Sequence, residues 1–109
     1  MALRADIWVA AYLRRASVEG AFATLRRRGA PEAGAIFVVV DRMDGRIALY
    51  EPAPSEDGER RWFRAHAAEW IDPPEAEARL QRQLRFDPDI WIVDVERRDG
   101  AHGLEVVSA

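Results

Sequence analysis

The sequence of 109 residues lacks cysteine entirely. This absence excludes disulfides, thiolate catalysis, and zinc or iron–sulfur centres held by cysteine. Long apolar runs are also missing, since the longest clean stretches are 7–13 and 35–40, whereas a bilayer span needs roughly 18 or more apolar residues. The first residues show no basic segment followed by an apolar core and a cleavage site. We therefore expect a soluble, cytoplasmic protein without a membrane anchor.

Several catalytic signatures are absent as well. The two histidines, His66 and His102, do not have the spacing of a helical zinc-binding pair. Ser17 and Ser55 do not stand in a nucleophile elbow, and the chain has no glycine-rich loop of the P-loop or dinucleotide-binding type. We therefore expect no cofactor and no metal ion, and we favour a non-enzymatic role without excluding an enzyme.

Composition and charge fit one small domain. With 49% hydrophobic and 32% charged residues, the chain can bury a core and cover it, and its length suits a single domain spanning residues 1–109. All 16 basic residues are arginine, which we attribute to genome composition rather than to a preference for guanidinium groups. The net charge of −3 gives no support to a dedicated nucleic-acid binder.

The charge is nevertheless unevenly distributed. Residues 1–28 contain six arginines against two acids, and residues 87–109 contain six acids against two arginines. Such asymmetry is typical of a polyanion-binding face, but folding can also place the two ends against each other and cancel the field. The sequence leaves both interpretations open.

A first helix is predicted at 6–18. Asp6 stands at the N-cap, alanines and arginines favour helix, and Gly20 supplies a stop signal. The seven successive apolar residues of this segment also fit a buried strand, because periodicity alone does not separate the two. A strand therefore stays an alternative here.

Two β segments, 21–28 and 35–41, flank a glycine-containing turn and predict a hairpin. Asp44-Gly45 is a favoured type I′ pair and leads into a third strand at 47–51. The pattern therefore predicts an antiparallel meander of three to four strands. The fourth is a weaker segment at 60–66, beyond a polar loop.

Asp72 as N-cap, with proline next and Glu75 third, predicts a second helix at 73–85. Its apolar side is expected to pack on the sheet, and Pro88 is expected to end it before a last strand at 90–96. The residues expected to face the sheet are Ala76, Leu80 and Leu84. The predicted fold class is α+β, with an N-terminal helix, the meander, this capped helix and a C-terminal strand.

Two groups of arginines are candidate anion-binding residues. One group ends the first predicted strand, where alternation separates its members between two faces, and the other forms a stripe along the second helix. Guanidinium groups can hold phosphate or carboxylate through two parallel hydrogen bonds. We prefer structural explanations, because charged strand ends deter edge pairing and cations near a helix C-terminus complement its dipole. The candidates are Arg26, Arg27, Arg28, Arg79, Arg82 and Arg85.

An acidic corner follows the second helix. Asp87 and Asp89 flank Pro88, and paired carboxylates can act as general acid and base or hold a divalent cation. A metal-assisted reaction there needs a further ligand, for which Glu19 and His66 are candidates. Aspartate is also common beside proline in turns, which is the explanation we prefer.

The chain contains a set of separated motifs. They are IWVAAYLRR at 7–15, EGAFA at 19–23, RG at 28–29 with AGA at 33–35, and RFDPDIW at 85–91. Together they resemble the bacterial family called domain of unknown function 1491, over nearly the whole chain. The resemblance implies a compact bacterial protein of about this size and brings no activity, substrate or catalytic residue. The motif residues of unknown role are Glu19, Gly20, Phe86, Pro88 and Trp91.

Three functions are compatible with these observations. A binding or interaction module is favoured, using a sheet edge or the arginine-bearing hairpin, with a protein or a second copy of the chain as partner. The alternative is a phosphate or nucleic-acid binder acting through the arginine groups, and a small metal-assisted enzyme at the Asp87/Asp89 corner comes third. Convergence of the two arginine groups on one concave face would favour the alternative, and divergence would favour the interaction module.

Overall fold

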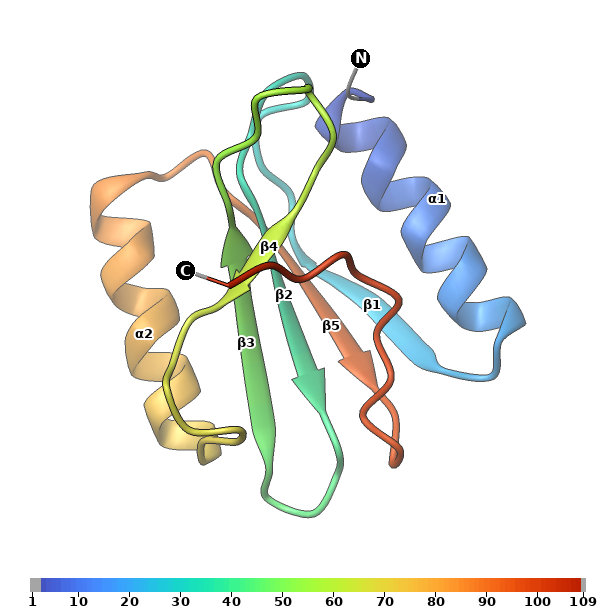
Figure 1. Cartoon of the computed structure of the whole chain (residues 1–109), viewed down its shortest axis with the longest axis vertical. Coiled ribbons are helices and arrows are strands. Elements are labelled where there is room, and N and C mark those ends of the chain that lie inside the picture. Colours follow the sequence, from blue (N-terminus) through green and yellow to red (C-terminus); the bar gives the residue numbers. More distant parts are fainter. Residues whose placement is uncertain (1–2, 109) are drawn as a thin grey trace.

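The computed structural model describes residues 3–108, in which five strands form one sheet with a helix on each face (Figure 1). In chain order the elements are α1 (Ala5–Val18), β1 (Phe22–Arg27), β2 (Ile36–Asp41), β3 (Ile47–Pro52), β4 (Trp62–Arg64), α2 (Pro73–Phe86) and β5 (Trp91–Glu96). The predicted α+β class, with an N-terminal helix, a capped second helix and a C-terminal strand, is confirmed.

The strand order of the sheet is β1-β5-β2-β3-β4. Strands β2, β3 and β4 form the predicted antiparallel meander. The predicted hairpin between 21–28 and 35–41 is wrong, because β5 inserts between β1 and β2, antiparallel to β1 and parallel to β2. Burial explains this order: β2 and β5 are largely buried and occupy central positions, whereas β1 carries exposed polar side chains that suit an edge.

Segment 6–18 is helical, so the strand alternative is wrong. The predicted N-cap is wrong too, because Arg4 occupies that position and Asp6 lies in the first turn. A side-chain cap is unnecessary, since the carbonyls of residues 31 and 32 accept hydrogen bonds of 2.9 and 3.0 Å from the first two helical amides. At the other end Gly20, with φ at 87°, supplies the predicted stop.

Alternating strand residues build two cores, one on each face of the sheet. The α1-face core contains Val9, Tyr12, Ala16, Val38, Val40, Val93 and Val95. The α2-face core contains Phe37, Val39, Leu49, Ala76, Leu80 and Ile92, with Leu84 packed against it. Neighbouring residues of β2 belong to different cores, as the two-residue period of a strand requires. The three α2 residues predicted to face the sheet therefore do so.

The predicted start of α2 is confirmed. The Asp72 carboxylate accepts a hydrogen bond of 2.9 Å from the Glu75 amide, and proline occupies the first helical position. The helix ends at Phe86, one residue beyond the prediction and just before the Asp87-Pro88 corner.

The turn between β2 and β3 is longer than predicted. Instead of a two-residue type I′ turn, a loop is closed by a hydrogen bond of 3.1 Å from the Arg42 amide to the Arg46 carbonyl. The left-handed residues are Met43 (φ 64°) and Gly45 (φ 85°), and Asp44 is not one of them. The Asp44 carboxylate accepts a hydrogen bond from the Arg46 amide at 3.2 Å, a short-range contact that favours aspartate in turns.

The C-terminal tail crosses over β4 (Figure 1). Glu105 and Val107 make backbone hydrogen bonds with Trp62 of β4, at 3.0 and 2.8 Å. The Tyr12 hydroxyl of α1 donates to the His102 carbonyl at 2.6 Å, which fixes the tail at a second point. The tail therefore shapes the surface around β4.

Candidate functional site

Arg26 of β1, the first predicted anion-binding residue, already has two carboxylate partners. Its Nε and Nη2 donate to both carboxylate oxygens of Asp94 on β5, at 2.8 and 2.6 Å, and Nη1 donates to Glu77 of α2 at 2.7 Å. These hydrogen bonds raise the pKa of Arg26 above its ordinary value. The basic and acidic ends of the chain thus meet at this point, and their charges compensate each other.

Arg27 and Arg28 contact other partners than Arg26 does. A bulge between Leu25 and Arg27 interrupts the pairing with β5. Nη2 of Arg27 donates to the Pro88 carbonyl at 2.6 Å, and the Arg28 guanidinium lies 5.3 Å from the centre of the Trp91 ring. The three arginines therefore do not form one patch.

The RFDPDIW motif interlocks with the glycines that precede β2. The Ala30 amide donates to the Asp89 carbonyl at 2.9 Å, and Trp91 Nε1 donates to the Ala30 carbonyl at 2.7 Å. A Cβ at Gly29 would overlap the Asp89 carbonyl oxygen, so only glycine allows this approach. This contact explains the RG motif at 28–29 and the RFDPDIW motif at 85–91 as segments that pack against each other, and it gives Trp91 a packing role.

The acidic corner does not meet the candidate metal partners. The Asp87 carboxylate accepts a hydrogen bond from the Asp89 amide at 2.9 Å. Glu19 lies 3.5 Å from Arg97, and both ring nitrogens of His66 are occupied by backbone groups. In the part of the chain that the structure describes, no group of three or more His, Asp or Glu side chains is placed to hold a metal ion.

Arg79 of α2 and Arg26 of β1 have separate carboxylate partners. Arg79 pairs with Glu75 at 2.8 Å and lines a hollow with Leu49 of β3, whereas Arg26 pairs with Glu77 of the same helix and with Asp94 of β5. Arg82 and Arg85 are exposed. The motif residue Phe86 is 86% exposed at the end of the same helix.

A cleft of about 400 Å³ lies where the loop between β3 and β4, the segment before β2 and the start of α1 meet. Figure 1 shows these three segments at one end of the molecule. The apolar residues of its wall are Leu3, Ala33, Ile36, Pro52, Ala53 and Trp62. Trp62 is 3% exposed and its Nε1 donates to the Ile36 carbonyl at 3.0 Å, so this part of the wall is fixed.

Arg60 brings a charge without a counter-ion to this cleft. Its Nη2 donates to the Leu3 carbonyl at 2.9 Å, and its Nε is buried with no hydrogen-bond partner. No carboxylate of residues 3–108 forms an ion pair with its guanidinium, and burial lowers the pKa of Arg60 below its ordinary value. The fold therefore leaves a partly desolvated cation facing a cleft whose wall is partly apolar.

The other charged residues of the cleft have partners. Arg4 pairs with two carboxylates at 3.2 and 3.3 Å, and Arg61 pairs with two at 2.8 and 3.4 Å. Glu59 also lines the cleft and is engaged in an interaction of its own. Arg27 also has a buried Nε without a hydrogen-bond partner within residues 3–108, but its guanidinium group contacts the Pro88 carbonyl.

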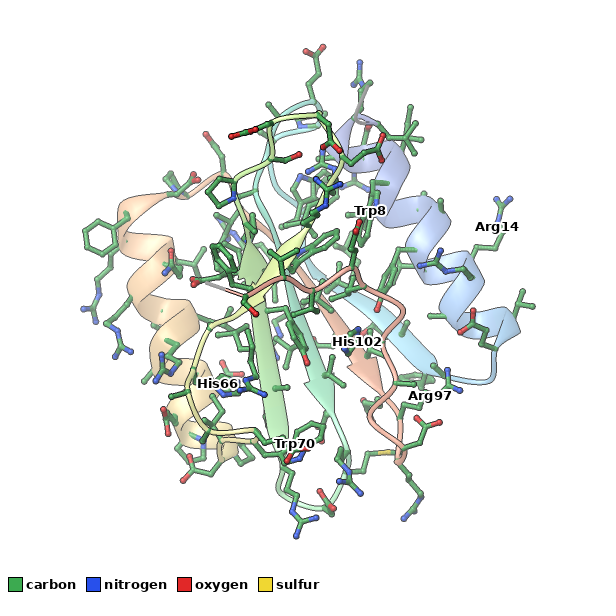
Figure 2. The ribbon with its side chains drawn as sticks, viewed as in Figure 1. Trp8, Arg14, His66, Trp70, Arg97 and His102 are labelled. Atoms are coloured by element: carbon green, nitrogen blue, oxygen red, sulfur yellow. The ribbon has the colours of Figure 1, made fainter. Side chains whose placement is uncertain are left out.

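Aromatic rings of α1 pack against Trp62 and against each other. The Trp8 ring lies 4.9 Å from that of Trp62 and 4.8 Å from that of Tyr12, against which it stacks. In Figure 2, Trp8 points from α1 toward the sheet, whereas Arg14 of the same helix points away. Packing against Trp8 helps to hold Trp62 in the cleft wall, where Trp62 is a natural fluorescent reporter of ligand binding.

A family model described as a protein of unknown function (DUF1491) matches residues 3–105. The chain belongs to the DUF1491 family. The resemblance carried by the separated motifs is thereby confirmed. No curated protein matches the chain.

Solved DUF1491 structures share this fold. The crystal structure of a family member from Caulobacter crescentus CB15, at 1.87 Å resolution, is 42% identical, with a TM-score of 0.82, covering 99% of this chain and 100% of that one. An NMR structure of a DUF1491 protein from the same organism is 45% identical, with a TM-score of 0.83 and 99% coverage of both chains. The solution structure of a protein from A. tumefaciens is 36% identical, with a TM-score of 0.86, covering 100% of this chain and 98% of that one.

Sequence reasoning does not find Arg60 in this DUF1491 protein. The preceding loop contains Glu56, Asp57 and Glu59, so an arginine pair after it looks locally compensated. Only Arg61 pairs with one of these acids, Asp57. The path of the loop decides which arginine is left without a carboxylate.

As for the membrane, neither helix within residues 3–108 combines the length and apolar character of a bilayer span.

Proposed function

We propose that this DUF1491 protein is a non-enzymatic, single-domain cytoplasmic binding module that holds a small organic anion in the Arg60 cleft. The ligand class is a carboxylate with an apolar body. One observation carries the proposal: the Arg60 guanidinium is partly buried, its Nε has no hydrogen-bond partner within residues 3–108, and it faces a cleft with a partly apolar wall.

The energetic argument starts from desolvation. Withdrawing a cation from water without a counter-ion is costly, and removing a buried donor from water without a bond adds to that cost. A carboxylate bound from solution would supply the missing counter-ion and accept a charge-assisted hydrogen bond from the guanidinium group. Within residues 3–108 the Arg60 Nη1 makes no hydrogen bond, so it is the donor available to such a ligand.

The apolar wall supports a ligand that is more than a free ion. Leu3, Pro52 and Ala53 keep apolar surface exposed along the cleft, and burying apolar surface lowers the free energy of binding by roughly 25 cal/mol per Å². The volume of about 400 Å³ falls within the range of roughly 300–1,000 Å³ typical of small-molecule sites. A short aliphatic or aromatic carboxylate fits this combination of charge and size.

The nucleic-acid alternative has less support. A polyanion binder needs several free cations on one face. Here Arg26 is engaged by two carboxylates and Arg79 by one, so neither is a free cation.

The experiment is a titration with octanoate and benzoate at low salt, followed by tryptophan fluorescence and calorimetry. Replacing Arg60→Gln is expected to weaken binding about tenfold or more, because a hydrogen bond to a charged group is worth roughly 1.5–3 kcal/mol. Arg85→Gln is the matched control, since it removes the same charge from an exposed position. A short single-stranded oligonucleotide is titrated in parallel.

Two results would overturn the proposal. One is no carboxylate binding at millimolar concentration, and the other is equal binding by the wild type and Arg60→Gln. Oligonucleotide binding that survives Arg60→Gln and weakens steeply with salt would favour the nucleic-acid alternative instead.

A further inference from the structure

A second hollow, of about 800 Å³, lies beside β3, β4 and the C-terminal tail. Tyr50, Arg64 and His102 are among the residues that line it. Tyr50 and Arg64 are register partners on adjacent strands, so their side chains project from the same face of the sheet. The Tyr50 ring lies 4.7 Å from the His102 ring, which comes from the tail. Three polar side chains from three segments thus surround one space.

Arg64 is held in place by backbone carbonyls. Its Nε donates to the His66 carbonyl and its Nη2 to the Ala67 carbonyl, both at 3.0 Å. No carboxylate of residues 3–108 forms an ion pair with it, so its Nη1 and its charge remain available. A guanidinium group oriented in this way loses little side-chain freedom when it binds an anion.

Tyr50 and His102 add two oriented donors. The Tyr50 hydroxyl makes no hydrogen bond with any group of residues 3–108, and burial raises the pKa of Tyr50, which keeps the hydroxyl protonated. His102 Nδ1 accepts a hydrogen bond of 3.0 Å from the Leu104 amide, which leaves the ring proton on Nε2. Burial lowers the pKa of His102, so the ring stays neutral near pH 7 and keeps this tautomer.

We infer that this hollow binds a phosphoryl group through Arg64 Nη1, the Tyr50 hydroxyl and His102 Nε2. All three groups are donors, and a tetrahedral oxyanion offers acceptor oxygens in several directions at once. Figure 2 labels His102 on the tail and His66 separately beside α2. Both ring nitrogens of His66 make hydrogen bonds with backbone groups, so we assign no ligand contact to His66. Glu51 also lines the hollow and limits its net positive charge, so binding depends on the three hydrogen bonds. This inference is independent of the Arg60 cleft.

The first test uses inorganic phosphate and, as a monoester, methyl phosphate, each titrated by calorimetry and followed by ³¹P line width. Arg64→Gln is expected to weaken phosphate binding about tenfold or more. Tyr50→Phe, which keeps the ring and removes only the hydroxyl, is expected to weaken it several-fold. Tighter binding of methyl phosphate would identify a monoester as the preferred source, and tighter binding of inorganic phosphate would identify the free ion.

Arg60→Gln serves as the control and makes the two proposals distinguishable. It is expected to leave phosphate binding unchanged, while Arg64→Gln is expected to leave carboxylate binding unchanged. Urea midpoints and far-ultraviolet circular dichroism establish that each variant is folded. Phosphate binding that is absent at millimolar concentration, or that is equal in the wild type, Arg64→Gln and Tyr50→Phe, would overturn the inference.

Discussion

Two arginine-bearing regions of this protein use their charges differently. At the corner formed by 26–34 and 85–91, Arg26 is bound by two carboxylates and Arg28 lies over an aromatic ring. In the β4 region, residues 60–66 with the tail at 102–107, the hydrogen bonds of Arg60 and Arg64 within residues 3–108 go to backbone carbonyls. The corner carries the longest arginine run of the sequence, yet the two candidate sites are lined by Arg60 and by Arg64. A dense charge run is therefore a poor guide to a binding site, because what counts is the balance of partners after folding.

The largest effect is expected from Gly29→Ala. Its Cβ would overlap the Asp89 carbonyl oxygen, and backbone atoms cannot move aside as a flexible side chain can. We expect a loss of about 3 kcal/mol in the free energy of unfolding, measured by urea denaturation. Gly45→Ala is the control, since Gly45 has open space around it and only the strain of a positive φ, which costs roughly 1 kcal/mol. Equal losses in the two variants would contradict a corner locked by close packing.

A smaller effect is expected from Arg26→Gln. The Asp94 side chain is 21% exposed, so it would lose both of its hydrogen bonds in a setting that water reaches only in part. We expect a loss of about 1–2 kcal/mol in the free energy of unfolding. Glu77→Gln removes only the more exposed partner, 53% exposed, and should cost less. If neither change altered the urea midpoint, the corner charges would have no structural role, and the contrast with the β4 region would fail.

The smallest expected effect is a pH dependence of the free energy of unfolding, caused by the two histidines of the β4 region. Burial lowers the pKa of both histidines in the folded state below the ordinary value of about 6.5. The unfolded chain therefore binds more protons as the pH falls through that value, and stability decreases on acidification. Urea midpoints at about pH 7.5 and about pH 5.5 should show this decrease, and His102→Gln should reduce it. A midpoint that rises on acidification would contradict the sign.

Local structure in this chain follows closely from local signals. Asp72 caps α2 through the Glu75 amide as its position predicts, and Gly20 ends α1 in a left-handed conformation. Both contacts join residues only a few positions apart, so propensity and turn chemistry are sufficient to foresee them. Asp6 is the exception, because the α1 amides are satisfied by a loop about 25 residues away, which local rules do not include.

The candidate sites were not predictable in the same way. Arg60 and Arg61 are adjacent in the sequence, yet only Arg61 acquires carboxylate partners. Tyr50, Arg64 and His102 share no motif and meet only because β3 pairs with β4 while the tail returns over them. No pattern within a short window carries this information.

The sequence by itself determined α2 with its capped start, the alternation of the strands and membership of the DUF1491 family. Tertiary structure decided that 6–18 is a helix, that β5 lies between β1 and β2, and that Arg60 and Arg64 have no carboxylate partner within residues 3–108. The physical reason is range: hydrophobic period, capping and turn formation act over a few residues, whereas strand order and charge compensation depend on groups brought together from distant parts of the chain.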